Sequence, residues 1–504
     1  MVFSSLEFIY LFLPPVLIVF FVLRHLQWEK GIIWWLIIAS IAFYAWWSPV
    51  HLILLILSIS INYGLHKVIL KTGKKSTLIF GIVINLATLA YFKYADFMIG
   101  NFNTVIGTDV PLIHIILPLA ISFFTFQQIA FLHDTYIGKI AECDFAKYCL
   151  FVVFFPQLIA GPIVMQKHTI PQFTLAVFRQ RVFVNLSVGS TLFIIGLFKK
   201  IVLADGVAPM ANAVFGLAET GVAVPMEAAW IGTFAYTFQI YFDFSGYCDM
   251  ALGLARLFGI RLPLNFNSPY KSLNIVDFWR RWHITLSTFL KNYLYIPLGG
   301  SRSGPIRRYI NLGATMLLGG LWHGASWNFV FWGLLHGLYL TVNHAWSKYL
   351  PNTIIANLYP PLHRFLAHAL TMLFVMIAWV FFRAESFDGA EAILKGMFGM
   401  SEYHNVKIWV EVLQDSGLFW IEVFALTLIV VWCPNSVEIV KNYRPVIGIN
   451  KMIRRATGFS KFWRKVIIWR PSHGWSSALF VVGVISLIQI YRLNELTEFI
   501  YFNF

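Results

Sequence analysis

Long apolar stretches recur along the whole of this 504-residue chain, and they limit its fold more than any other feature. A helix needs about 20 mostly apolar residues to cross the hydrocarbon core of a bilayer. Candidate stretches begin near residues 8, 31, 50, 77, 112, 183, 228, 309, 327, 365, 418 and 475. Only 12% of the residues are charged, whereas soluble domains carry about 25%. The sequence therefore predicts an all-α, polytopic membrane protein with roughly 10 to 13 spans.

Two further apolar stretches, 148–165 and 285–300, are interrupted by proline and glycine, so we interpret them as re-entrant or broken helices. Such backbone is tolerated at membrane depth only where it is covered by protein or lines a cavity. No linker rich in Pro, Gly or Ser divides the chain, which favours a single membrane domain. We expect N-terminal helices at 1–110, a central core at 111–350 and C-terminal helices at 351–504.

Loop charges predict the orientation. The loops that follow the first and third stretches are basic. The loop 95–111, which follows the fourth stretch, has two aspartates and no Lys or Arg. Basic loops stay in the cytoplasm. The segment 441–474 has nine Lys and Arg and no acid, and Glu495 and Glu498 follow it. We expect a plasma or inner membrane protein with both termini outside the cytoplasm.

The net charge of +15 is spread over these loops, which argues against nucleic-acid binding. For the basic segment 441–474 we favour topogenic charge and attraction to anionic membrane lipid. A specific anionic ligand, such as a nucleotide phosphate, stays open as the second interpretation.

Polar residues inside apolar stretches are functional candidates, because burying them in hydrocarbon costs free energy. In 236–260, Gln239 and Asp243 are spaced to share a helix face, and glycines at 246, 253 and 259 allow close helix packing. We favour a polar network that fixes the packing of this helix over direct catalysis. The following loop, PLNFNSPY, is interpreted as interfacial.

Three histidines lie in the other polar clusters. His283 follows a pair of arginines in an apolar segment, and His323 is bracketed by glycines in LLGGLWHGASWNF. Asn328 and His336 are eight apart and lie near one helix face. Imidazole suits proton transfer, because its charge changes near physiological pH. A metal site is disfavoured, because His323 and His336 are thirteen residues apart and no Cys or Glu lies near.

Several motifs resemble those of the membrane-bound O-acyltransferase family, in the branch that contains the alginate O-acetyltransferase membrane subunit. They are, in order, MVFSSLEF, PQLIAGPI, the block YTFQIYFDFSGYCDMALGLARLFGIRLPLNFNSPY, RRWHITLSTFLKNYLYIPLGG and GGLWHGASWNFVFWGLLHG. The likeness covers nearly the whole chain and is weakest beyond about residue 385.

The resemblance implies transfer of an acyl group from a thioester to a hydroxyl. Its main catalytic residue corresponds to His323, and its second site corresponds to His283, where Thr285 replaces the more usual residue of the motif. His336 is a third candidate, and Asn328 and Asp243 are candidate supporting residues. We expect His323 to act as general base, and His283 or a backbone N–H near residue 324 to stabilise the oxyanion.

The resemblance also implies acetyl-CoA as the acyl donor, with no permanently bound cofactor. A separate extracytoplasmic transferase resembling SGNH hydrolases, together with polysaccharide-synthesis machinery, would be the partners in O-acetylation of alginate or a related polysaccharide. Peptidoglycan O-acetylation and D-alanyl transfer to teichoic acid are alternatives within the family. Outside it, a proton-coupled transporter or flippase and a scaffold subunit stay open, although no inverted repeat supports the transporter.

Overall fold

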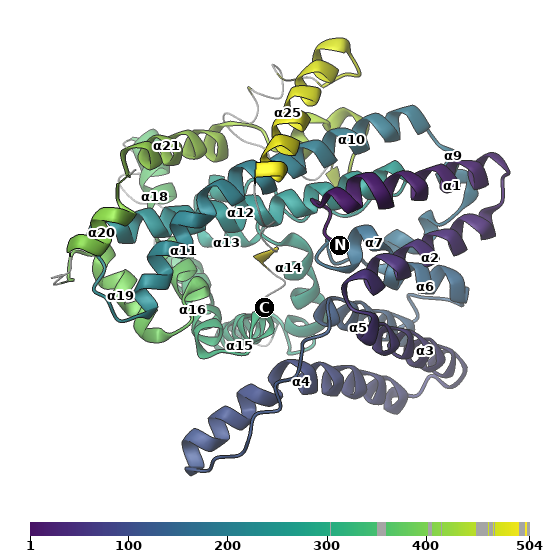
Figure 1. Ribbon diagram of the computed structural model, residues 1–504. Coiled ribbons are helices and arrows are strands. Elements are labelled where there is room, and N and C mark those ends of the chain that lie inside the picture. The colour runs from purple at the N-terminus through teal and green to yellow at the C-terminus, as the bar shows by residue number, and fades with distance from the viewer. Residues whose placement is uncertain are drawn as a thin grey trace.

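The computed structural model describes residues 1–302, 304–349, 359–401, 406–414, 416–449, 462, 467, 469–492 and 499–500. Within these ranges the only β pairing is an isolated parallel bridge between Pro263 and Ile447. The described chain is otherwise helices and loops, as Figure 1 shows. Its apolar residues form one large core and a small second cluster of Ile69, Leu78 and Leu132. The predicted all-α class is confirmed.

Seven helices in the described part are long and apolar enough to cross a membrane. They are η1–α1 (Glu7–His25), α2 (Glu29–Trp47), α3 (Pro49–Thr72), α4 (Lys75–Ile106), α10–η3–α11 (Val182–Glu219), α18 (Pro360–Arg383) and α25 (His473–Arg492). The helix α21 (Ser416–Trp432) is apolar but shorter. This is fewer than the 10 to 13 spans expected from sequence.

Four helices lie in the remaining predicted stretches but fall outside this set. They are α5 (Ile121–Tyr136), which is short, and α12 (Met226–Leu257), α15 (Pro305–His323) and α16 (Trp327–Tyr349), which are less apolar or carry more charge. Most of α12 is buried, so its polar residues meet protein rather than lipid. The stretch near 112 begins helix only at Ile121, because prolines occupy 111 and 118 and Asp96 accepts hydrogen bonds from the backbone of Ile113 and Ile115.

The central pair of helices is α10 (Val182–Phe198) with α12, which run side by side across the molecule in Figure 1. A Cβ on Gly189 would lie 2.8 Å from the carbonyl oxygen of Gly253, and one on Gly196 would lie 2.6 Å from that of Gly246. The predicted role of the glycines at 246 and 253 in close packing is confirmed. The π-helix η3 (Lys199–Ala204) follows, and α11 (Asp205–Glu219) continues the rod.

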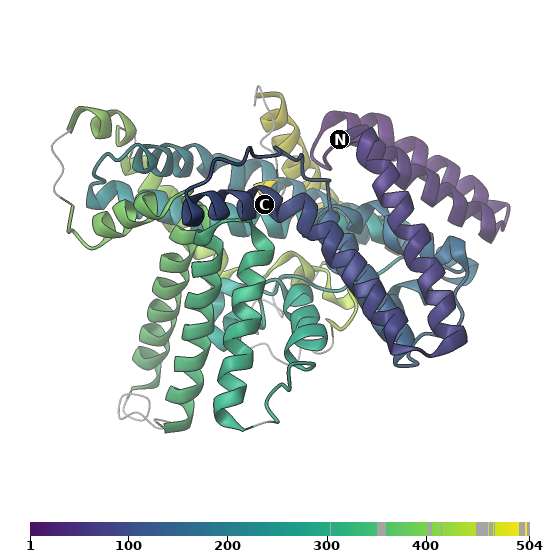
Figure 2. The same ribbon diagram turned by 90° about the horizontal axis from the view of Figure 1, so that it is seen from below.

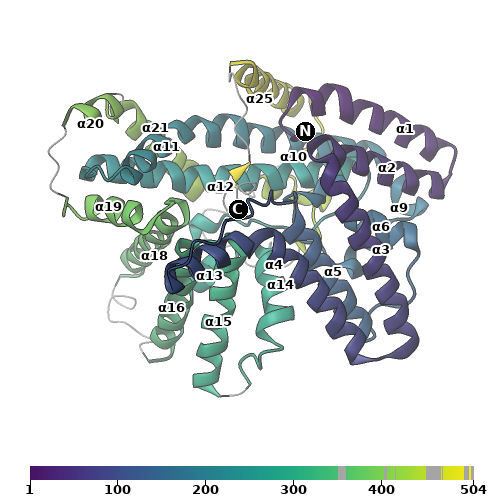
Figure 3. The same cartoon turned by 60° about the horizontal axis from the view of Figure 1, so that its bottom comes forward.

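Both interrupted stretches are broken, as predicted. The first contains α6 (Phe145–Val153) and α7 (Phe155–Leu158), followed by non-helical backbone. The second contains α14 (Ile284–Leu290), the π-helix η5 (Lys291–Tyr295) and a run of turns. Figure 3 shows α14 beside α15, beneath the long central pair.

The helices α15, α16 and α18 project together to one side of the central pair, as Figure 2 shows from below. Short elements complete the described fold: α8 (Gln166–Thr169), η2 (Ile170–Gln172), α9 (Leu175–Arg179), η4 (Pro269–Lys271), α13 (Ile275–Trp279), α19 (Phe387–Met397), α20 (Val406–Val412), α22 (Ser436–Ile439) and η6 (Lys441–Tyr443). Glu495, Glu498 and half of the basic segment 441–474 lie outside the described residues.

Candidate active site

The crossing of α15 and α16 brings two backbones into contact beside His323. A Cβ on Gly320 would lie 2.2 Å from the carbonyl oxygen of Phe329, and one on Gly333 would lie 2.5 Å from that of Met316. Small residues allow such an approach, and larger ones would separate the helices. The helix α15 continues unbroken through Gly320 to His323.

The break follows His323 instead. Gly324 adopts an extended conformation that ends α15, and a Cβ there would lie 2.1 Å from the ring of Phe329. The next helix, α16, begins only at Trp327. His323 is therefore the last residue of its helix, with 3% of its surface exposed. A helix end leaves its last carbonyl groups without helical partners.

Two residues of α4 bind these carbonyl groups. Lys93 Nζ donates to the carbonyl oxygens of Trp322 at 2.6 Å and His323 at 3.0 Å, and Tyr94 Oη donates to that of Leu321 at 2.8 Å. A positive charge at the C-terminus of a helix is also favoured by the helix dipole. Sequence reasoning missed both residues, although a lone lysine in an apolar stretch was the available signal.

The three candidate histidines lie in one row of alternating imidazole and indole rings. Trp322 contacts His283 and His323, with ring centroids 6.3 Å and 4.9 Å apart. Trp332 contacts His323 and His336 at 5.1 Å and 4.7 Å. The structure therefore brings together His283, which directly precedes α14, and residues of α15 and α16 that are up to 53 positions away from it.

Each of the two indoles in this row carries a buried N–H group, which is a hydrogen-bond donor. Nε1 of Trp322 and Nε1 of Trp332 are buried and have no hydrogen-bond acceptor in the described part of the chain. A buried donor without a partner is costly and calls for an explanation. Both N–H groups belong to rings that touch His323, so they are candidate donors to a reacting carbonyl oxygen.

His283 is fully buried and held by Asn265. Its Nδ1 lies 3.0 Å from Asn265 Oδ1, which also accepts hydrogen bonds from the backbone N–H and the hydroxyl of Thr285. A backbone N–H is always a donor, so the atom of Asn265 facing it is the oxygen. His283 Nδ1 must then carry the proton, which leaves Nε2 of the neutral ring as a proton acceptor.

The backbone at His283 is strained as well, with φ of 41°. Residues other than glycine in this left-handed region cost free energy, and such residues cluster at active sites. The loop PLNFNSPY, interpreted as interfacial, places Asn265 at 0% exposure inside the protein. Sequence reasoning missed Asn265 for that reason.

His336 is also fully buried, and its ring is oriented by α13. Trp279 Nε1 donates to His336 Nδ1 at 3.3 Å. An indole N–H can only donate, so the neutral imidazole carries its proton on Nε2. That nitrogen has no partner within the described ranges. His283 and His336, at the two ends of the row, are therefore opposite tautomers: the proton is on Nδ1 in His283 and on Nε2 in His336.

Two supporting candidates have structural contacts instead. Asn328 Nδ2 donates to the carbonyl oxygen of Ala384 at 2.8 Å, which joins α16 to the end of α18. Asp243 forms an ion pair with Lys200 at 2.8 Å and accepts a hydrogen bond from the backbone N–H of Ile500. Its neighbour Phe244, on the next position of α12, contacts the His283 ring at a centroid distance of 4.9 Å.

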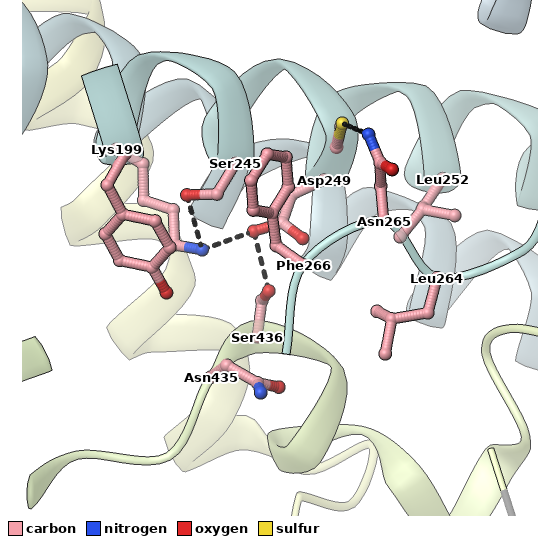
Figure 4. Close-up of a pocket in the computed structure, with 11 residues that line it drawn as sticks. Lys199, Ser245, Asp249, Leu252, Leu264, Asn265, Phe266, Asn435 and Ser436 are labelled. Carbon is pink, nitrogen blue, oxygen red and sulfur yellow. Dashed lines mark hydrogen bonds and ion pairs between the residues drawn. The ribbon is translucent and has the colours of Figure 1, made fainter. Parts of the chain in front are cut away.

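The burial of Asp243 is explained by a group of ion pairs that join η3 to α12. Lys200 also pairs with Asp205 at 2.8 Å, and Lys199 pairs with Asp249 at 2.7 Å. Figure 4 shows Lys199, Asp249 and Ser436 around a pocket of about 10 Å³, which is room for one water molecule. The same view shows Asn265, whose amide donates to Cys248 Sγ at 3.3 Å. Asp243 and Asp249 thus take part in ion pairs that join α12 to η3.

Comparison with known proteins decides the family. The model for "MBOAT, membrane-bound O-acyltransferase family" matches residues 139–357. A peptidoglycan O-acetyltransferase of Helicobacter pylori is 43% identical, and the match covers 80% of each chain. The chain belongs to the membrane-bound O-acyltransferase family.

Other relatives lie in the same family. A probable alginate O-acetylase of Pseudomonas aeruginosa is 41% identical over 80% of this chain and 76% of its own. A teichoic acid D-alanyltransferase of Streptococcus thermophilus is 26% identical over 46% of this chain and 57% of its own. This membrane-bound O-acyltransferase is thus a multi-pass acyltransferase, and the transporter and scaffold interpretations are set aside.

Proposed function

We propose that this enzyme takes an acetyl group from acetyl-CoA on the cytoplasmic side and supplies it for O-acetylation of a polysaccharide outside the membrane. One observation carries the proposal. Two relatives with identities of 41–43%, matched over more than three quarters of each chain, are both named for O-acetylation, one of peptidoglycan and one of alginate. A match of that length includes all the residues of the ring row.

The ring row supplies the chemistry for this transfer. An acceptor hydroxyl attacks the thioester carbonyl carbon, and its proton passes to a histidine nitrogen. The C–S bond then breaks as the histidine returns that proton to the leaving thiolate, which releases the thiol and the new ester. His323 lies between the two indoles and is the proposed general base. The N–H groups of Trp322 and Trp332 would hold the carbonyl oxygen as negative charge develops on it.

The proposed role of His283 changes from the sequence expectation. With its proton on Nδ1, the neutral ring presents a lone pair at Nε2 and accepts a proton rather than stabilising an oxyanion. We therefore propose His283 as a second proton acceptor, with Asn265 holding its tautomer. His336, with its proton on Nε2, is the proposed donor at the other end of the row.

The candidate acceptors of the acetyl group follow from the names of the relatives. Alginate, or a related exopolysaccharide, is the leading substrate class, because several relatives with identities of 37–41% are named for alginate O-acetylation. Peptidoglycan is the second candidate, because a relative with 43% identity is named for its O-acetylation. D-alanyl transfer has weaker support, since that relative matches under half of the chain. A separate extracytoplasmic transferase, resembling SGNH hydrolases, would receive the acetyl group and modify the polymer.

The test separates these polymers. Source cells lacking this protein are complemented with the wild-type chain, with His323→Ala or with His283→Ala. Ester-linked acetate is then measured separately on purified exopolysaccharide and on purified peptidoglycan. We expect acetate on one polymer to disappear in the deletion and in His323→Ala, while immunoblots show normal membrane levels of the variant. Normal acetate on both polymers in the deletion strain would refute the proposal.

A further inference from the structure

Four arginines gather where the ends of α10 and α12 meet the segment that follows α22. Arg256 lies in the last turn of α12, and Arg261 lies in the next loop. Arg181 precedes α10, and Arg444 follows η6. Arg256 lies within electrostatic range of Arg261 and Arg181, and Arg261 lies within range of Arg444 and Arg181. We refer to these residues as the arginine cluster.

Backbone contacts hold the cluster together. Gln172 binds both backbone groups of Arg261, at 2.9 Å through its oxygen and at 3.0 Å through its nitrogen. Ile447 N donates to the carbonyl oxygen of Leu262 at 3.0 Å. Arg256 Nη2 donates to the carbonyl oxygen of Tyr443 at 3.3 Å. Three segments far apart in sequence therefore converge on one place.

The described part of the chain offers this cluster no neutralising ion pair. Among the described residues, no ion pair involves any of the four arginines. The sequence has no acid at all between 439 and 494, so the residues that follow Arg444 add only positive charge. Burial, with the charges of Arg444 and Arg181, lowers the pKa of Arg261.

Arg256 is the strongest sign of a missing partner. Its side chain is 2% exposed, and its Nε has no acceptor in the part of the chain that the structure describes. A buried charge without a counter-ion is strongly destabilising. Its immediate charged neighbours are further arginines, so an anionic ligand would remove the cost.

The start of α10 points to the same kind of ligand. Arg181 occupies its N-cap with φ of 43° and makes no side-chain cap, so the first N–H groups of this 17-residue helix lack one. N–H groups at a helix N-terminus together with arginine side chains are a common phosphate site. Arg444 is held in the same left-handed conformation, with φ of 48°.

We propose that the arginine cluster binds the phosphate group of a small ligand. Two sources share this chemistry: the phosphates of the coenzyme A donor, and the headgroup of an anionic membrane lipid. The orientation predicted from loop charge places the end of α1 that carries Arg24 in the cytoplasm. The arginine cluster lies at the same end, because Phe20 of α1 contacts Phe258 and Phe178, at centroid distances of 5.0 Å and 5.9 Å. On this orientation the cluster faces the cytoplasm.

The placement suits one donor molecule that reaches both sites. Phe244 contacts the His283 ring, and Arg256 follows it by twelve residues on α12. That spacing corresponds to about 18 Å along the helix. A donor whose phosphates and thioester lie at opposite ends of a long arm can place the first at the cluster and the second at the ring row. Phosphate binding itself does not depend on the proposed acetyl donor.

The test uses the full-length protein in detergent and in nanodiscs. Because Arg181 and Arg444 are exposed, the double variant Arg181→Gln/Arg444→Gln should fold normally. Lys74→Gln/Lys75→Gln removes the same charge from another exposed loop and is the matched control. Arg256→Met tests the buried position. Binding of coenzyme A is compared with binding of pantetheine, which lacks phosphates, and retained phosphatidylglycerol is counted by native mass spectrometry.

We expect the arginine variants to weaken coenzyme A binding by about tenfold or more, as for loss of a charge-assisted hydrogen bond, with pantetheine unchanged. If the source is lipid, coenzyme A binding stays constant and the retained phosphatidylglycerol is lost. Either result supports the site, provided that the lysine control variant does not show it. Unchanged binding of both ligands in folded variants overturns it, whatever the outcome of the acetylation assays.

Discussion

Lys93 and His323 are joined by a hydrogen bond of 3.0 Å from the lysine Nζ to the histidine carbonyl oxygen, and a second bond of 2.6 Å reaches the carbonyl oxygen of Trp322. The residues are 230 positions apart. The lysine thus holds the helix end that carries the proposed base, and it acts through backbone groups rather than through the imidazole itself.

Lys93→Met should lower acetyl transfer by about tenfold or more, because the loss of two charge-assisted hydrogen bonds frees the end of α15. Lys93→Arg keeps the charge and should restore part of the activity. The measurement is transfer rate per folded protein, with folding checked by size-exclusion chromatography. A Lys93→Met variant with wild-type activity would show that this anchor does not position His323.

Trp322→Phe removes one proposed oxyanion donor and keeps a ring against Phe126, on which Trp322 stacks at 5.3 Å. We expect the turnover number to fall by about 10²- to 10³-fold with little change in donor KM, as for loss of one oxyanion donor. Trp327→Phe is the matched control, since Trp327 Nε1 donates to Asn101 away from the row. Equal effects of the two substitutions would argue against a catalytic N–H.

Asn265→Leu should reduce activity because His283 loses the acceptor that fixes its proton on Nδ1. Asn265→Asp keeps an oxygen in the same place and should retain much more activity. Nitrogen NMR of protein labelled in histidine reports which ring nitrogen is protonated in each variant. Cys248→Ala removes only the acceptor of the Asn265 amide N–H group and is the control. Identical tautomers in wild type and Asn265→Leu would contradict the positioning role.

The pair formed by Lys200 and Asp243 predicts an effect on stability rather than on chemistry. Lys200→Met leaves the buried carboxylates of Asp205 and Asp243 without their cation, and should destabilise the protein by about 3–5 kcal/mol. Thermal unfolding in detergent measures this. Lys395→Met breaks an exposed pair with Glu391 and should have almost no effect. Loss of transfer in a fully stable Asp243→Asn variant would instead return Asp243 to the catalytic candidates.

Much of the architecture could be predicted from sequence because hydrocarbon imposes a simple rule. Apolar stretches of sufficient length predict the helices, and proline and glycine in 148–165 and 285–300 predict the breaks. The same rule identified His283, His323 and His336 as functional candidates, because burying such polar side chains in hydrocarbon costs free energy. The rule does not tell whether a helix such as α12 meets lipid or other protein, because that depends on the tertiary packing.

Sequence by itself determined the membrane class, the family motifs and the three histidines, since each depends on residue type and local spacing. Only the tertiary structure decided that indoles separate these histidines, that Asn265 holds His283, and that Lys93 binds the end of α15. It also assigned Asp243 to an ion pair and gathered the arginine cluster from three segments. The reason is physical: a hydrogen bond or charge contact depends on distance in space, and packing brings together residues that sequence spacing keeps apart.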